Sequence, residues 1–478
     1  MKKQVEWPND HIRNRFTQWQ LGLLTVVILG INFIGALNNS VIQIALPNLS
    51  SEIGVRYETL SIIISVYWLS AGIVALPSGK LGDMYSPKKV FIWGLGIFAF
   101  ASILCAFTSS YLIITVLRAL QGIGVSIAVV NGVSLLRIIY PTSQIDTAMG
   151  YWAASISLGY VLGPSVGGFL VEEIGWRLTF AISGLLITLF LGIALWLLPS
   201  TNAENVTFDY QGASLLTVMI ITLLLVISPL QEESWGWVTT TSLLFIFVAS
   251  SYWFFKHENN VQEPLINLST FTQNRQFQMS ILSGATYSAS MQGLIFGLQY
   301  YLQAAQHYSP SQSGSFWMVM SISNLIASLL VGKLSKVTGT RRLAIIGTAI
   351  RCLAFAALVI LTLSSPNQNL SFFIVVIMLL FGIGMGTTSA PLYSLVVGTF
   401  EQKDTGTIAG TYNTIRHISS SIGVAIFSQS LLGLSILPAV SNASNLSLAF
   451  ILAFIIAFLG MIFLWLIPKQ NLSFSTAS

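Results

Sequence analysis

The chain has 478 residues, of which 54% are hydrophobic and only 8% are charged, and its formal net charge is +5. A soluble domain carries about 25% charged residues, so this composition excludes a soluble globular protein and indicates one that crosses a membrane many times. The positive charge follows from basic loops on one side of that membrane and gives no indication of a nucleic-acid surface.

Apolar runs of about 20 residues can cross a hydrocarbon core about 30 Å thick, and such runs follow one another along the chain with short polar breaks. In chain order they predict fourteen membrane-spanning helices, at 19–46, 58–78, 89–107, 110–137, 145–170, 177–198, 210–230, 239–256, 276–304, 312–335, 342–363, 370–398, 404–433 and 446–467. The first run is too long for a cleavable signal peptide, so we expect it to stay attached.

The placement of basic residues predicts the orientation, because loops rich in Lys and Arg stay in the cytosol. With the N-terminus inside, the outer loops hold only Arg56 and Arg177 of the 21 basic residues, and most of the others fall on inner segments. The sequence therefore predicts a multi-pass protein of the cell membrane with both termini in the cytosol. We expect a monomer whose partners are the lipid bilayer and a small-molecule substrate, with no nucleic acid.

One inner loop occurs twice. The loop after the second predicted span reads GKLGDMYSPKK (79–89), and the loop after the tenth reads GKLSKVTGTRR (332–342). This repeat predicts an all-α integral membrane fold of two six-helix bundles with two additional helices between them. The expected parts are a cytosolic N-terminal segment (1–18), the N-terminal bundle (19–198), a linker with the two extra spans (199–275), the C-terminal bundle (276–468) and a cytosolic tail (469–478).

Three stretches carry a resemblance to a known family. They are the inner-loop residues Gly79, Leu81, Asp83 and Lys88, the fourth-span residues Arg118, Gln121, Gly122 and Gly124, and the fifth-span sequence GYVLGPSVGG (159–168). Together they resemble the major facilitator superfamily, and within it the fourteen-span branch of drug:proton antiporters. The inner loop departs from the family pattern at Met84, Ser86 and Pro87. The resemblance implies transport by alternating access, and the fifth-span motif implies export.

The fifth-span motif has a physical interpretation of its own. Its glycines at 159, 163, 167 and 168 fall close to one face of a helix, so a neighbouring helix can approach to backbone contact. Pro164 removes a backbone donor and permits a bend. The sequence leaves two alternatives open, a hinge that moves during transport or plain close packing of two helices.

The loop at 79–89 joins two spans that move relative to each other if access alternates. Asp83 can accept hydrogen bonds from a basic partner or a helix N-terminus, and such contacts break when the inner side opens. We therefore expect Gly79, Asp83 and Lys88 to belong to an inner gate. The alternative is a solvated turn that only carries the basic signal for orientation.

Arg118 lies within an apolar span, where a cation costs at least about 2.5–3.5 kcal/mol and must face the bundle interior or water. The acidic residues fall in loops or at span ends, so no carboxylate is available to Arg118, Arg351 or Arg416 at membrane depth. Their partners are backbone carbonyls, side-chain amides, water or an anionic ligand. Asn38 stands where proton-coupled members of the resembled branch carry an aspartate, and an amide cannot titrate.

Polar residues on the first and ninth spans fall on helical stripes suited to a cavity, although hydrogen bonds between helices explain such stripes equally well. We expect the solute to contact spans 1, 2, 4, 5, 9 and 13. The candidate binding residues are Asn38, Gln43, Tyr67, Arg118, Trp152, Gln292, Phe296, Gln299, Asn413 and Arg416.

The sequence predicts an exporter of a small organic solute, neutral or anionic, that lacks the usual proton carboxylate of the first helix. A conventional proton-coupled multidrug pump and a facilitator or importer of a metabolite remain alternatives. The four histidines are scattered and no loop is long enough for a soluble site, so we expect no catalytic residues, no metal and no cofactor. The tails are too short for a receptor or scaffold.

Overall fold

The computed structural model describes residues 17–140, 144–200, 208–227, 237–261, 265, 274–364, 370–398, 405–432 and 442–468, and within them every regular element is a helix. The helices are α2 (Gln18–Ile53), α3 (Tyr57–Tyr85), α4 (Pro87–Cys105), α5 (Tyr111–Ile139), α6 (Ile145–Leu197), α7 (Tyr210–Ile227), α8 (Trp237–Asn260), α10 (Arg275–Tyr300) with a π-helical extension η3 (Tyr301–Ala305), α11 (Pro310–Thr338), α12 (Thr340–Ser364), α13 (Leu370–Val397), α14 (Thr405–Leu432) and α15 (Asn442–Leu466).

A helix occupies each of the fourteen predicted ranges. In the described part of the chain, eleven helices are long and apolar enough to cross a membrane, which confirms a multi-pass membrane protein. The helices α10 and α14 are not among the eleven, because serine, threonine and glutamine interrupt their apolar residues. The number of spans therefore stays a prediction.

The loop predicted between the fifth and sixth spans is absent, because α6 continues from Ile145 to Leu197. The only break in its described backbone is Gly175, with φ 79° and ψ 160°. Glycine reaches this conformation without steric strain, so a single residue redirects the chain. We call the end of the molecule that holds the α2–α3 turn and Gly175 the outer end, following the predicted orientation.

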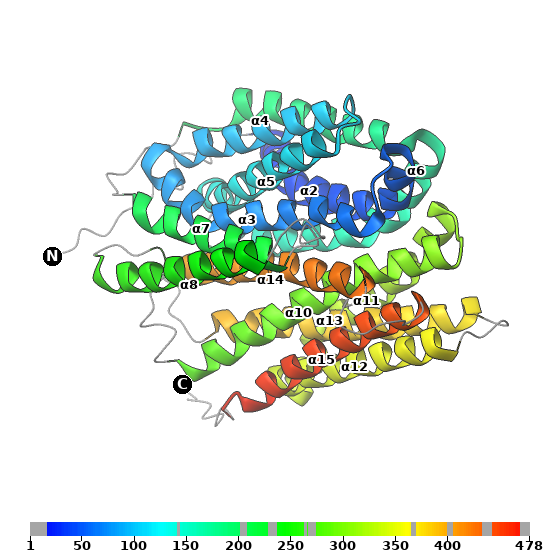
Figure 1. Ribbon diagram of the computed structural model, residues 1–478. Helices are drawn as coiled ribbons and strands as arrows, with labels where there is room; N and C mark the ends of the chain where they lie inside the picture. Colours follow the sequence, from blue (N-terminus) through cyan, green and yellow to red (C-terminus); the bar gives the residue numbers. More distant parts are fainter. Residues whose placement is uncertain are drawn as a thin grey trace.

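Two groups of helices face each other along the length of the molecule. Figure 1 shows α2 to α6 on one side and α10 to α13 with α15 on the other. The helix α14 packs on α10 of the second group. The two groups meet where α3 packs on α14 and where α6 packs on α11. The α7–α8 hairpin covers the α3–α14 crossing through an apolar cluster of Leu69, Leu216, Ile220, Leu224, Phe254 and Ala425.

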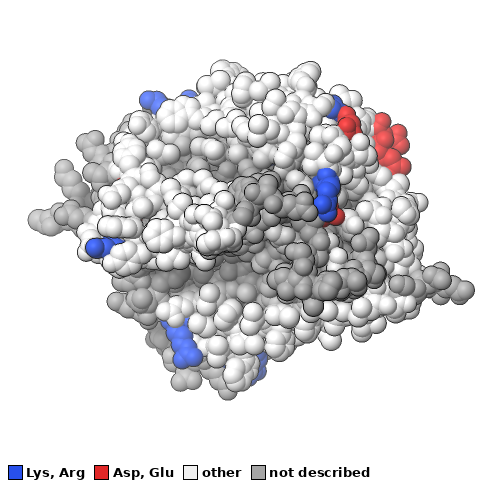
Figure 2. Space-filling model, viewed as in Figure 1, with Lys and Arg blue, Asp and Glu red and all other residues white. Residues whose placement is uncertain are grey.

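Charged side chains are sparse on the face that Figure 2 shows, and the visible acidic ones lie toward the end opposite the chain termini. The uncharged part of the described surface suits contact with lipid. Many large apolar side chains are exposed on the described helices, among them Phe100, Leu112, Phe169 and Leu329.

The repeated inner loop makes the same contact twice. Lys88 Nζ donates to the Leu198 carbonyl oxygen at 2.5 Å, at the C-terminus of α6. Arg341, at the same position in the second copy, donates to the carbonyls of Leu464 and Trp465 at the C-terminus of α15. Helix C-termini present carbonyls without intrahelical partners and favour cations. The contact of Lys88 lies within one group of helices, so a structural role stands beside its predicted role in gating.

Lys88→Met and Arg341→Met should each weaken the fold by about 1 kcal/mol, the value typical of a cation at a helix C-terminus. The apparent unfolding temperature of the purified protein measures this loss. Lys89→Met is the matched control, because Lys89 is the exposed neighbour of Lys88. Equal shifts for Lys88→Met and Lys89→Met would contradict the capping role.

Candidate functional site

The α5 helix carries Arg118 into the centre of the N-terminal helices, where the side chain is 0% exposed. Its Nη1 donates to Asn38 Oδ1 and to Gln121 Oε1, both at 2.8 Å, and its Nη2 donates to Asn39 Oδ1 at 3.0 Å. Its Nε contacts the Ile63 carbonyl oxygen at 3.4 Å. We call these four acceptors the amide cage. Arg118 is thus held by amides and a backbone carbonyl, one of the alternatives that the sequence left open.

An aromatic ring completes the surroundings of Arg118. The guanidinium carbon lies 4.2 Å from the centre of the Tyr67 ring, a cation–π distance, and Tyr67 Oη donates to the Gly35 carbonyl oxygen at 3.3 Å. Gln121 is fixed in turn, because its Nε2 donates to Ser102 Oγ at 2.8 Å. An anionic ligand is therefore not needed to satisfy the hydrogen-bond donors of Arg118 in this conformation.

Arg351 and Arg416, the other two arginines at membrane depth, have fewer hydrogen-bond partners. Arg351 is 1% exposed, donates from Nη2 to Ser290 Oγ at 2.6 Å and stacks 4.4 Å from the centre of the Tyr287 ring. Arg416 is half-buried on α14, and its Nε contacts Ser288 Oγ at 3.4 Å. Their surroundings contain hydroxyls and rings where Arg118 has three amides.

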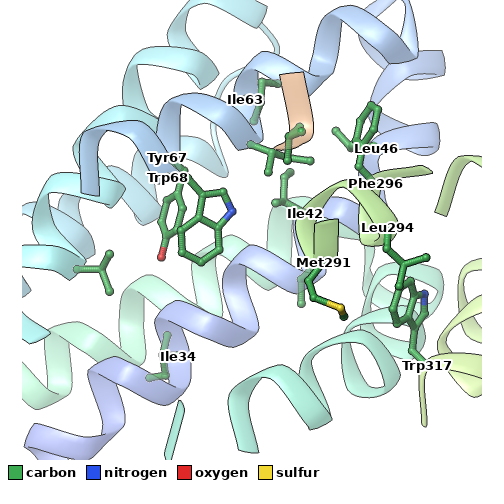
Figure 3. Close-up of a cluster of buried hydrophobic side chains, with 14 of the residues drawn as sticks. Ile34, Ile42, Leu46, Ile63, Tyr67, Trp68, Met291, Leu294, Phe296 and Trp317 are labelled. Atoms are coloured by element: carbon green, nitrogen blue, oxygen red, sulfur yellow. The ribbon is translucent and has the colours of Figure 1, made fainter. Parts of the chain in front are cut away.

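Predicted binding residues meet between α2 and α10, toward the outer end. Gln43 Nε2 donates to Gln292 Oε1 at 3.4 Å. Tyr57 Oη donates to the Phe296 carbonyl oxygen at 3.1 Å, with ring centres 5.0 Å apart. Gln303 Nε2 donates to the Ile44 carbonyl oxygen at 3.2 Å. Figure 3 shows the Phe296 ring beside Leu46, so an apolar contact accompanies these hydrogen bonds.

The ninth-span stripe does not face one cavity. Gln299 turns away from α2 and accepts hydrogen bonds from Trp317 Nε1 at 2.8 Å and Ser313 Oγ at 3.1 Å, both on α11. In this conformation the stripe consists of hydrogen bonds between helices, as the alternative interpretation of the sequence held.

The glycines of the fifth span face two different helices. Gly159, Gly163 and Gly167 face α2, where an added Cβ would lie 2.6 Å from the nearest atom in each case. Gly168 faces α11, where an added Cβ would lie 2.4 Å from the Pro310 carbonyl oxygen. A Cβ added to Gly314 of α11 would likewise lie 2.8 Å from the Pro164 carbonyl oxygen. The motif therefore packs α6 against α2 within one helix group and against α11 of the other group.

A carboxylate joins the two groups at the outer end. Glu172 Oε2 accepts hydrogen bonds from Ser309 Oγ and the Ser311 backbone N–H, both at 2.8 Å, at the N-terminus of α11. This contact could not be predicted, because both partners lie at span ends that look like ordinary loops.

Other candidate residues lie apart from these contacts. Trp152 is half-buried on α6, where its indole N–H has no hydrogen-bond partner among the described residues, and Asn413 is half-buried on α14. Gly79 has room around it, since an added Cβ would lie 3.8 Å from the Val130 Cγ1. Asp83 is exposed at the inner end of α3. Their proposed roles stay predictions.

Sequence reasoning missed two contacts between α3 and α14. Trp68 stacks on His417 with ring centres 5.2 Å apart. Ser421 Oγ donates to the Ser65 carbonyl oxygen at 2.9 Å, and Ser65 Oγ contacts the Ser421 carbonyl oxygen at 3.5 Å. Trp68 follows the predicted Tyr67 directly, which was the one available signal.

Known proteins resemble most of the chain. It is 25% identical over 409 residues to the riboflavin transporter RibZ of Clostridioides difficile, covering 85% of this chain and 87% of that protein. It is 26% identical to the multidrug transporter protein MdtP of Bacillus subtilis, covering 84% and 74% respectively. Among solved structures, a POT family transporter in complex with a thioalcohol-conjugated peptide has a TM-score of 0.70 at 15% identity, covering 94% of this chain and 96% of that one.

A bacterial homologue of the human lysosomal transporter Spinster, in an inward-facing conformation, has a TM-score of 0.66 at 14% identity and covers 95% of this chain and 98% of that one. The family described as Major Facilitator Superfamily matches residues 28–424. With its apolar helices and its two facing helix groups, the chain belongs to the Major Facilitator Superfamily and is a multi-pass membrane transporter.

Proposed function

We propose that the chain exports a small neutral or anionic organic solute across the cell membrane by alternating access. In this proposal fourteen spans form two six-helix bundles, 19–198 and 276–468, with α7 and α8 between them and both termini in the cytosol. The observation that carries it is the closure at the outer end, where the two groups touch through α2 with α10 and through α6 with α11.

The closure consists of contacts that can be broken and remade. Neutral hydrogen bonds such as Gln43 to Gln292 are individually worth only about 0.5–1.5 kcal/mol. Gly168 has no side chain where α6 approaches Pro310 of α11, so the two helices can separate without side chains that interlock. These properties suit a gate that opens outward while Gly79 and Asp83 close the inner side.

The nature of the solute follows from the polar residues and the relatives. The polar α10 and α14 suit helices that line a water-filled path, since lipid-facing helices are more apolar. Transporters of riboflavin and of multiple drugs among the relatives support an organic solute. Asn38 beside Arg118 supports transport without a proton carried by the first helix.

Flux into and out of proteoliposomes tests the proposal. We expect the wild-type protein to move a neutral or anionic organic solute from the cytosolic to the outer face, with a rate that does not depend on an imposed pH gradient. Proton-driven efflux of ethidium-like cations would return the protein to the conventional multidrug class. Net transport toward the cytosol would identify an importer.

Asn38→Asp should create a dependence on pH. The new carboxylate would stand where Oδ1 now lies 2.8 Å from Arg118 Nη1, and it could release and bind a proton during the cycle. We expect an imposed pH gradient to change the flux of this variant at least threefold and to leave that of the wild type unchanged. Asn32→Asp, two turns away and beside Ser155, is the control and should not respond.

A further inference from the structure

We propose that Arg351 and Arg416 bind the oxyanion of an organic carboxylate or phosphate monoester within the C-terminal helices. The inference rests on the proposed function and names the chemical class of its solute. It moves the anion site away from Arg118, whose donors are already engaged by the amide cage.

Arg351 is a buried cation with an incomplete set of partners. It is 1% exposed, yet its Nε has no hydrogen-bond partner among the described residues. Its one hydrogen bond to a described side chain goes to Ser290. A charged donor left unpaired in a buried position destabilises the fold, and an oxyanion bound to it would remove that cost.

Arg416 reaches the same face of α10 from α14, where its Nε contacts Ser288 Oγ. Tyr287, whose ring centre lies 4.4 Å from the Arg351 guanidinium carbon, is one helical turn from Gly284. A Cβ added to Gly284 would lie 2.4 Å from the Tyr412 ring, and the Arg416 guanidinium carbon lies 5.5 Å from the centre of that ring. Unlike Arg351, Arg416 is only half-buried, so a solute can reach it.

No acidic side chain offsets the two arginines. From residue 264 to the end, the chain contains only two acids, Glu401 and Asp404, and both precede α14. The described helices α10 to α15 contain none. Two cations at membrane depth without a countercharge favour an anion, because attraction grows as the local dielectric constant falls.

Packing alone does not require an arginine at 351. In the corresponding place of the N-terminal helices, a Cβ added to Gly124 would lie 2.6 Å from the Phe98 backbone nitrogen. In the C-terminal helices, a Cβ added to Gly384 would lie 2.6 Å from the Arg351 Cγ and 3.0 Å from the Arg351 backbone nitrogen, which is the equivalent close approach. A phenylalanine therefore fills this layer in one copy of the repeat, and the second copy adds a charge.

The ligand class follows from the donors and rings. A guanidinium group is planar and matches the two oxygens of a carboxylate or phosphate. Tyr412, whose ring centre lies 5.5 Å from the Arg416 guanidinium carbon, and Tyr393, 5.9 Å from Tyr412, supply aromatic surface beside it. An aromatic organic anion suits this combination better than a bare inorganic ion.

Calorimetric binding to the full-length protein in phosphatidylcholine nanodiscs tests the inference with matched pairs of probes. The pairs are benzoate with benzamide, phenyl phosphate with phenol, and flavin mononucleotide with riboflavin; inorganic phosphate is the single-ion control. We expect at least one organic anion to bind the wild type at least tenfold more tightly than its neutral partner. Arg416→Gln and Arg351→Lys should each weaken that anion at least tenfold and leave the neutral partner within twofold.

Lys336→Gln removes an exposed positive charge from the same half of the chain and should change neither affinity. The inference is overturned if no organic anion outbinds its neutral partner, if the preference survives both arginine substitutions, or if inorganic phosphate binds as tightly as the organic anions. Because Arg416 is half-buried, its variant is expected to fold even if Arg351→Lys does not. A wild-type protein that binds the anion but moves no solute in proteoliposomes would instead refute the proposed function.

Discussion

Gly168→Val should shift the transporter toward a conformation that is open at the outer end and lower its transport rate at least tenfold. A Cβ on Gly168 would lie 2.4 Å from the Pro310 carbonyl oxygen and 3.3 Å from the Gly314 Cα. Both are backbone atoms of α11, so no side chain can turn aside to make room. The outer closure seen here is then disfavoured relative to a conformation in which α6 and α11 have separated.

Labelling of a cysteine placed at Leu46 measures the opening. Leu46 is fully buried beside Phe296, so a membrane-impermeant maleimide should reach Leu46→Cys from outside only when the closure opens. We expect at least tenfold faster labelling in the Gly168→Val background. Gly163→Val is the control, because its Cβ would clash with Ser40 of α2 within the same helix group, and it should lower the unfolding temperature without faster labelling. Unchanged labelling and wild-type flux from Gly168→Val would refute the role of this crossing.

Arg118→Leu should prevent stable folding or lower the unfolding temperature more than any other single substitution proposed above. The change leaves the buried oxygens of Asn38, Asn39 and Gln121 without their common donor. Each buried acceptor left without a donor costs about 1–3 kcal/mol, and the substitution leaves several at once. Transport of neutral and anionic solutes should be lost alike, because the substitution disrupts the N-terminal helices and not a solute contact.

Arg416→Leu is the contrasting control. Arg416 is half-buried and makes one long contact with a serine, so its loss should leave the unfolding temperature near that of the wild type. Thermal unfolding in detergent, followed through tryptophan fluorescence, compares the two variants. An Arg118→Leu protein as stable as the wild type would show that the amide cage contributes little to the fold.

The helices could be predicted from the sequence because each one is an apolar run bounded by polar residues. The α6 helix shows where this reasoning stops. The polar break at 171–176 predicted a loop between two spans, but Gly175 alone turns the chain by adopting a conformation open to glycine, and helix continues on both sides of it.

Sequence reasoning limited the kinds of partner that Arg118 can have but could not identify the partner residues. The sequence excluded carboxylates, and two polar residues were visible, Asn38 in the first span and Gln121 one turn from Arg118 in the same span. Which acceptors reach the guanidinium group depends on how α2 is rotated against α5, and hydropathy carries no information about that rotation. Gln299 shows the same limit, because its position on the stripe of Gln292 predicted a shared cavity, whereas Trp317 on α11 binds it from another side.

The neutral amide of Asn38 also bears on what powers the proposed export. An amide beside Arg118 takes up no proton, so an anionic solute would leave the cell without a compensating charge carried by this helix. In a cell whose interior is electrically negative, each exported monoanion moves with the membrane potential, which contributes about 2.3 kcal/mol per 100 mV. That voltage alone would sustain an outward concentration ratio of roughly fiftyfold, so the resting potential could drive this transporter with no coupled ion.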